Sequence, residues 1–182
     1  MSDKLPENLR KSPRASWIDY DCGTYFVTIC THNRCHYFGE INQGRMNLSE
    51  IGKFVKRELE NPADHNLNVE IPLFVIMPNH LHAIVYCSDT QNLIINNSPG
   101  SQRNPNPSQR TFPDMKRQTP LLSKYIGLMK AAVSRYARTI NPEFRWQARY
   151  YDHAIRGTHD GNKIADYIET NVIRWESDCF YD

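Results

Sequence analysis

Two histidines separated by one residue, His80 and His82, have the spacing in this sequence that most directly permits chemistry. They open a segment, residues 80–87, whose alternating pattern predicts a strand. Both rings would then project from one face, with Cα atoms about 6.5 to 7 Å apart. Imidazole pairs of this kind bind divalent metals. Such pairs also arise by chance on exposed strands, but these lie in a hydrophobic string, where unpaired polar rings are costly to bury. This setting favours a functional role for both rings, with metal binding as one candidate.

The elements that must position the pair alternate between strands and helices. The hydrophobic patterns predict strands at 24–31, 67–77, 80–87 and 144–156, a hairpin or turn at 37–48, helices at 50–60 and 121–140, and a final helix from Thr158 or Asp160 to about Trp175. This order, β, α, β, β, α, β and a terminal α, predicts an α+β fold. We expect a ferredoxin-like antiparallel sheet with its helices on one face.

Size and composition limit the class of protein. A length of 182 residues fits one domain, and the Asn-, Pro-, Ser- and Gln-rich stretch 88–120 predicts a long flexible loop within it. No apolar run approaches the roughly 20 residues of a membrane span, and the polar first twenty residues contain no secretory signal, so we expect a cytoplasmic protein. Five cysteines without a CxxC spacing argue against a zinc ribbon. A net charge of +2 permits nucleic-acid binding without demanding it.

Several strings resemble one known family. Met77-Pro-Asn-His-Leu-His82 is similar to a motif of the small tyrosine transposases, the family of insertion-sequence and REP-associated transposases. The resemblance extends over residues 20 to 178 and includes the strings at 28–34, 38–41 and 146–151. A Tyr-Ile-x-x-Asn string from Tyr167 to Asn171 looks closer to the REP-associated branch. In that family both histidines bind a divalent metal, which implies Mg²⁺ or Mn²⁺ here.

The resemblance also implies a nucleophile, Tyr167 on the final helix. A tyrosine phenolate can attack phosphorus and store the bond energy as a phosphotyrosine. Asn171 lies one helical turn further on and would supply a third metal ligand. This sequence places Val172 where the family commonly has proline, so the helix can continue. Alternatively, Tyr167 is a core residue of an apolar helical stripe, and Tyr150 or Tyr151 competes for the role.

Single-stranded DNA beside an imperfect hairpin is the partner that this resemblance implies. Residues for DNA contact are predicted on two segments: Arg149 and His153, and Lys124, Lys130 and Arg135. A hydrogen-bonded structural role for His153 is an equal alternative. A relaxase-like or replication-initiator-like nicking enzyme and a domesticated, non-catalytic DNA-binding protein remain open. The sequence also leaves open whether the tyrosine helix serves its own metal site as a monomer or that of a partner in a homodimer.

Overall fold

The computed structural model describes residues 22–88 and 119–181, so the predicted loop at 88–120 lies almost wholly outside the described part. The strands are β1 (Gly23–Cys30), β2 (Gly39–Asn42), β3 (Arg45–Leu48), β4 (Val69–Ile76), β5 (His80–Cys87) and β6 (Tyr151–Ala154). The helices are α1 (Glu50–Glu60), α3 (Leu121–Ile140) and α4 (Gly157–Thr170), with short 3-10 helices η2 (His32–Arg34), η3 (Pro62–His65) and η5 (Trp175–Ser177).

Four strands form an antiparallel sheet in the order β4-β5-β1-β6. β1 and β5 are therefore central, and β2 and β3 form a separate hairpin. The chain order of sheet strands and covering helices is β-α-β-β-α-β, followed by α4. This confirms the predicted α+β class and the ferredoxin-like arrangement.

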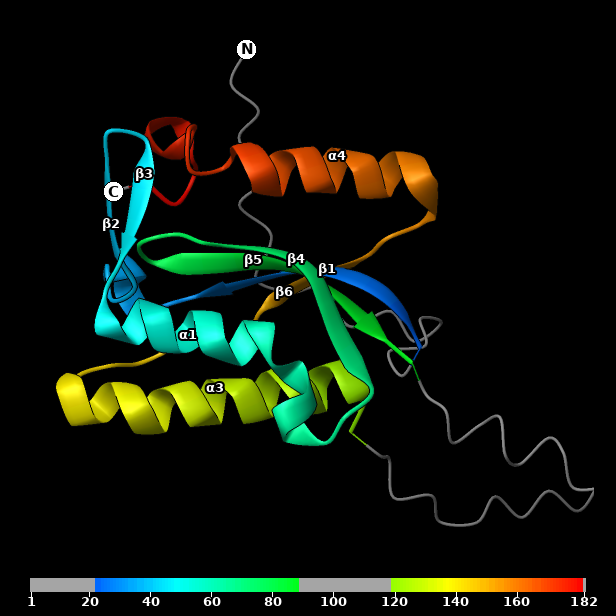
Figure 1. The fold of residues 1–182 in the computed structure, drawn as a ribbon, viewed down its shortest axis with the longest axis horizontal. Coiled ribbons are helices and arrows are strands. Elements are labelled where there is room, and N and C mark those ends of the chain that lie inside the picture. The colour runs from blue at the N-terminus through cyan, green and yellow to red at the C-terminus, as the bar shows by residue number, and fades with distance from the viewer. Residues whose placement is uncertain (1–21, 89–118, 182) are drawn as a thin grey trace, which may run out of the picture.

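The helices lie in two layers, one on each side of the sheet (Figure 1). α1 and α3 cover one face, where Tyr25, Val27 and Ile29 of β1 are buried in the main hydrophobic core. The intervening residues of β1, Phe26 and Thr28, point to the opposite face, under α4. The expectation that all helices share one face is therefore wrong for α4. Because helices lie on both faces, a site can form between a strand and the helix above it.

The fourth sheet strand is much shorter than the predicted 144–156. Within that segment the side chain of Phe144 is fully buried, Trp146 makes an isolated bridge to Thr31, and Arg149 has a positive φ of 67°. A residue in the left-handed region interrupts the extended backbone, so regular pairing with β1 begins only at Tyr151. Aromatic and β-branched content alone did not reveal this break.

The end of α4 also differs from the prediction. The α-helix ends at Thr170 and not near Trp175, although Asn171 keeps helical dihedral angles of −60° and −44°. Single turns follow, in which the amide of Arg174 donates to the carbonyl of Thr170 at 3.2 Å. The helix also begins at Gly157, before Thr158 and Asp160, the two residues predicted to begin it. Asp160 lies inside the first turn and accepts from the amide of Arg156 at 3.0 Å.

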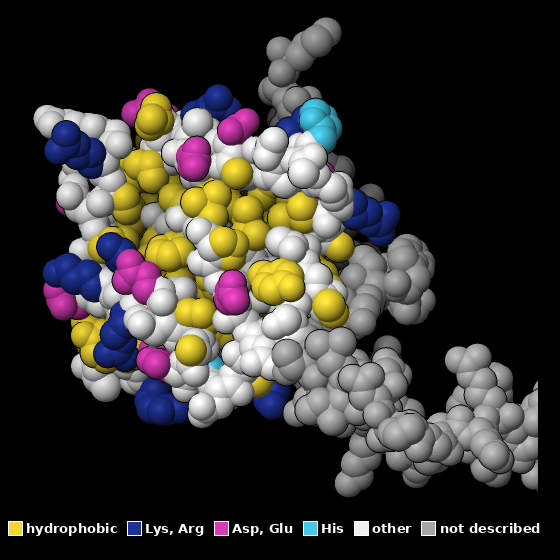
Figure 2. All heavy atoms as spheres, turned by 45° about the vertical axis from the view of Figure 1, so that its right-hand side comes forward, with side chains coloured by type: hydrophobic (Ala, Val, Ile, Leu, Met, Phe, Trp, Pro, Cys, Tyr) yellow, Lys and Arg dark blue, Asp and Glu magenta, His cyan; other side chains and the backbone are white. Residues whose placement is uncertain are grey.

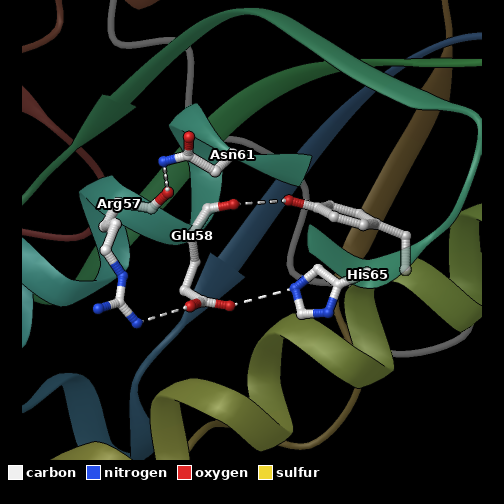
Figure 3. A network of polar contacts seen from close by, with 5 residues as sticks. Arg57, Glu58, Asn61 and His65 are labelled. Atoms are coloured by element: carbon white, nitrogen blue, oxygen red, sulfur yellow. Dashed lines mark hydrogen bonds and ion pairs between the residues drawn. The ribbon is translucent and has the colours of Figure 1, made fainter. Parts of the chain in front are cut away.

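A polar network joins α1, η3 and α3 beneath the sheet (Figure 3). The carboxylate of Glu58, which is buried, lies 3.3 Å from Nη2 of Arg57 and 3.1 Å from Nε2 of His65. Its backbone carbonyl accepts from the hydroxyl of Tyr125 on α3 at 3.3 Å. These bonds connect α1, η3 and α3, and the hydrophobic periodicity of the sequence does not predict such contacts between elements. At the other end of α1, Ser49 caps the helix by accepting from the third amide of the helix.

The layer that contains α4 covers its face of the sheet only in part. Figure 2 shows apolar side chains gathered between the polar outer surface of α4, at the top of the view, and the lower helices. The edge strand β4 contributes side chains of intermediate exposure, including Leu73 and Val75. Among the described residues, no helix has the length and apolar character that crossing a membrane requires.

Candidate metal centre and tyrosine

His80 and His82 begin β5 on the face of the sheet that α4 covers. Their Nε2 atoms lie 3.0 Å apart, and their exposed fractions are 0% and 1%. Alternation along the strand places both rings on one face, as the spacing predicted. The two nitrogens therefore converge on one point inside the protein.

The other nitrogen of each ring is held by a neighbouring side chain. Oδ1 of Asn79 lies 2.8 Å from Nδ1 of His80, and Oγ1 of Thr28 lies 2.8 Å from Nδ1 of His82. An amide oxygen only accepts, so Nδ1 of His80 carries the hydrogen and its Nε2 has a free lone pair. Metal-binding histidines usually have such a partner on the second nitrogen, because it fixes the ring.

Burial keeps both histidines neutral. The pKa of His80 lies well below its ordinary value because the ring is buried, and electrostatic interactions with His82 and Arg34 lower it further. Burial alone lowers the pKa of His82 to about 3. Neutral imidazoles present the lone pairs that a metal ion needs.

A carboxylate completes this cluster. Asp178, in the segment after α4, places a ligand atom within 4.8 Å of those of His80 and His82. Nε2 atoms 3.0 Å apart match two adjacent ligands of an octahedral ion with bonds of about 2.1 Å. Asp178 was missed in the sequence, because it follows the last predicted helix in a stretch without periodicity.

Asn171, the predicted third ligand, lies at this cluster in contact with the carboxylate. Its Nδ2 donates to Oδ2 of Asp178 at 3.1 Å, while its Oδ1 is buried without a hydrogen-bond partner. An orphaned buried oxygen carries a free-energy cost, which a bound cation would relieve. The donors are two imidazoles, a carboxylate and an amide oxygen, a set that suits a divalent metal.

Tyr167 on α4 reaches the same point from above the sheet. Its hydroxyl lies 3.1 Å from Nε2 of His82, and its side chain is 37% exposed. Burial raises its pKa, as do the charges of Asp178 and Cys179, against a smaller lowering effect of Asn171. The phenol is therefore protonated unless a positive charge comes near it. The structure thus brings the predicted tyrosine and histidines together.

The rival tyrosines have other surroundings. The hydroxyl of Tyr150 lies 3.1 Å from Oγ of Ser123 on α3. Tyr151 pairs with Thr28 across the sheet, and its ring meets that of Phe26 at 6.3 Å. The hydroxyl of Tyr167, by contrast, lies at hydrogen-bond distance from a histidine of the pair.

The residues predicted to contact DNA are dispersed. His153 lies on the α4 side of β6, where its Nε2 is 3.0 Å from the carboxylate of Asp160. Arg149 is exposed on the segment before β6, while Lys124, Lys130 and Arg135 all belong to α3 in the opposite layer. The ammonium of Lys130 donates to the carbonyls of Gln147 and Arg149 at 3.0 and 3.1 Å. Its observed role is structural, since it holds the segment that leads into β6.

The segment after α4 closes over the histidines. The ring of Phe180 lies 4.5 Å from that of His80, and its carbonyl accepts from Nδ2 of Asn79 at 2.9 Å. Trp175 packs 6.0 Å from the His80 ring, and the guanidinium of Arg34 lies 5.6 Å from the centre of Phe180. This cover explains why the pair is buried. Phe180 and Arg34 had no signal in the sequence pattern.

Comparison with known proteins finds a relative in sequence and similarity to solved structures. No family model matches the sequence. An uncharacterised protein of Haemophilus influenzae is 35% identical over 174 residues, which cover 94% of this chain and 93% of that protein. The solved structure of a REP-associated tyrosine transposase bound to a REP hairpin matches with a TM-score of 0.58 and 17% identity, over 91% of this chain and 74% of that chain. At this identity the structural match shows a shared fold.

Proposed function

Because this chain belongs to the same family as the Haemophilus influenzae protein and has the fold of a REP-associated tyrosine transposase, we propose that it is a metal-dependent, single-tyrosine DNA transposase. Its substrate would be single-stranded DNA beside a hairpin, in line with the REP hairpin bound by the structural neighbour. The observation that carries the proposal is the hydroxyl of Tyr167, 3.1 Å from Nε2 of His82, at a cluster of metal-ligand side chains.

His80, His82 and Asp178 would hold the metal, with Oδ1 of Asn171 as a further donor. Mg²⁺ or Mn²⁺ suits this set, and two imidazoles favour Mn²⁺ over Mg²⁺. When bound, the ion supplies positive charge that polarises a phosphate and opposes the effects that raise the pKa of Tyr167.

The chain's own groups define the covalent step. Oη of Tyr167 attacks the phosphorus, a new phosphotyrosine bond forms, and the bond from phosphorus to the 3′ oxygen breaks. The phenol loses its proton and the leaving 3′ oxygen takes one up, so the proton count is unchanged. The product is a 5′-phosphotyrosine and a free 3′-hydroxyl, and the reverse reaction needs no nucleotide cofactor.

The position of the phenol on α4 suits this chemistry. Phe26 supports the Tyr167 ring edge-on at 6.1 Å, and His82 packs against it at 5.1 Å. Contacts on two sides limit the directions in which the hydroxyl can point. Orientation of a nucleophile in this way contributes to rate, because a misplacement of about 1 Å can cost about 100-fold.

A denaturing gel with labelled DNA tests the proposal. Incubation of the protein with single-stranded DNA that forms an imperfect hairpin, in the presence of Mn²⁺, should give a covalent protein–DNA adduct. Tyr167→Phe should give none, whereas Tyr86→Phe, an exposed tyrosine distant along β5, should match the wild type. An adduct that persists in Tyr167→Phe would exclude this tyrosine. Retarded migration without any adduct would instead indicate a DNA-binding protein that does not cleave.

A further inference from the structure

A row of aromatic rings leads from Tyr167 to the edge of the sheet. The ring of Phe26 lies 6.1 Å from Tyr167 and stacks on His82 at 5.3 Å with an interplanar angle of 22°. On its other side, Phe26 meets the ring of Tyr151 at 6.3 Å and 70°. Tyr151 is opposite Thr28 in the register of β1 and β6, so it lies on the same face as His82. The ring of Phe26 therefore lies between Tyr167 and Tyr151 of the edge strand β6.

The outer members of this row are open to solvent. Tyr151 and Tyr167 are each 37% exposed, whereas His80 and His82 are buried. β6 is the last strand of the sheet, and no further strand within the described residues covers its outer side. A ligand that reaches the Tyr167 hydroxyl from solvent therefore has an exposed aromatic surface beside it.

The charges around Tyr151 indicate which part of a nucleotide fits there. Burial raises the pKa of Tyr151, and the carboxylates of Asp152 and Asp160 raise it further; Asp160 is itself paired with His153 and is also close enough to Lys163 to be affected by its charge. Carboxylates repel a phosphate but do not repel a neutral base. An aromatic ring accepts any unpaired base, because every base has a π face.

We propose that the ring of Tyr151 is a stacking platform for an unpaired nucleobase next to the phosphate that Tyr167 attacks. The inference deepens the proposed function and rests on it. It assigns Tyr151 a binding role in place of the nucleophilic role considered from the sequence. Stacking would fix the strand on one side of the scissile phosphate, while the metal-ligand cluster holds the other side of the site.

Two probes of equal charge test the proposal without knowledge of the target sequence. Fluorescence anisotropy would compare oligo-dT of about 16 nucleotides with an oligomer of the same length built from abasic units, both in EDTA. The wild type should bind oligo-dT more tightly. Tyr151→Ala should reduce the ratio of the two affinities at least about fivefold, because it removes the ring that stacks. Tyr151→Phe keeps the ring and should retain the ratio within about twofold.

Each alternative result has a definite meaning. If Tyr151→Ala weakens binding of both probes equally, its role is structural and the proposal is wrong. If Tyr151→Phe loses the preference as alanine does, the hydroxyl and not the ring makes the contact, which also refutes stacking. The adduct at Tyr167 is scored separately on the denaturing gel. If the wild type forms the adduct but Tyr151→Ala leaves the ratio of the two affinities unchanged, only the stacking proposal is refuted. If Tyr151→Ala lowers the ratio but the wild type forms no adduct, the cleavage chemistry is refuted.

Discussion

Asn79 holds two parts of the site at once, and its removal should separate their contributions. The side chain is 1% exposed, with Oδ1 at 2.8 Å from Nδ1 of His80 and Nδ2 at 2.9 Å from the carbonyl of Phe180. Asn79→Ala removes the partner of a buried ring N–H and that of a partly buried carbonyl. An unsatisfied buried group costs about 1 to 3 kcal/mol, so the free energy of unfolding should fall by at least about 1 to 3 kcal/mol.

The same substitution should weaken metal binding. Partners of metal-binding histidines orient the ring, and their loss typically reduces affinity by about 10- to 100-fold. Asn79→Asp provides the matched variant, because a carboxylate still accepts from Nδ1 of His80 but cannot donate to the carbonyl of Phe180. We expect Asn79→Asp to lose stability while it retains Mn²⁺ affinity within about threefold.

Two measurements on each variant decide the matter. Urea denaturation without metal gives the free energy of unfolding, and isothermal titration calorimetry gives the Mn²⁺ dissociation constant. If Asn79→Ala binds Mn²⁺ as tightly as the wild type while its stability falls, then the orientation of His80 by Asn79 is unimportant and the reasoning fails. Equal weakening of Mn²⁺ binding in both variants would show that the tie to Phe180, and not the ring orientation, controls the site.

Three further predictions concern single side chains. Asp178→Asn should weaken Mn²⁺ binding by at least about 10-fold in calorimetry, because it removes the anionic donor of the cluster, and unchanged affinity would exclude it as a ligand. Tyr125→Phe should lower the free energy of unfolding by about 1 kcal/mol in urea denaturation, since it deletes the bond to the Glu58 carbonyl; no loss would show that the 3.3 Å contact contributes nothing. Burial lowers the pKa of Lys130 to about 8, so between pH 8 and its ordinary value of 10.5 only the unfolded chain holds the proton. As the pH rises across this window, the free energy of unfolding of the wild type should therefore increase by about 1 to 2 kcal/mol relative to that of Lys130→Met, a value that allows for partial exposure of the side chain. Urea denaturation at both ends of the window measures this difference. A difference that does not change with pH would show that the ammonium is not desolvated.

Much of the scaffold was predictable from local patterns. The apolar periodicity of α1 and α3 reports burial against one face of the sheet, so both helices occur where the pattern predicts them. The HxH spacing places both rings on one side of β5 for the same reason. The segment from Phe144 to Tyr150 misled the prediction, because its aromatic side chains pack into the core from an irregular backbone held by Lys130. Aromatic content reports burial and does not by itself report extended geometry.

Geometry alone predicted only part of the candidate site. The spacing of His80 and His82 on a strand places both rings on one face, whereas Tyr167 was predicted from the family resemblance. Asp178 and Phe180 reach the site through the turns after α4, and tertiary contacts alone bring them to β5. Nothing in their local sequence distinguishes them from any other acid or aromatic residue near a chain end.

The hydrogen bond between Thr28 and His82 allows the ring of His82 to change its tautomer. A threonine hydroxyl both donates and accepts, so it can stay bonded at 2.8 Å to Nδ1 of His82 whether or not that nitrogen carries the ring proton. The proton can therefore move from Nε2 to Nδ1 with a simple reversal of hydroxyl direction. Nε2 then becomes free for an ion without any proton leaving the protein, so His82 would not contribute to proton uptake or release when the ion arrives. Thr28→Val would remove this relay and leave the ring without a partner for its second nitrogen.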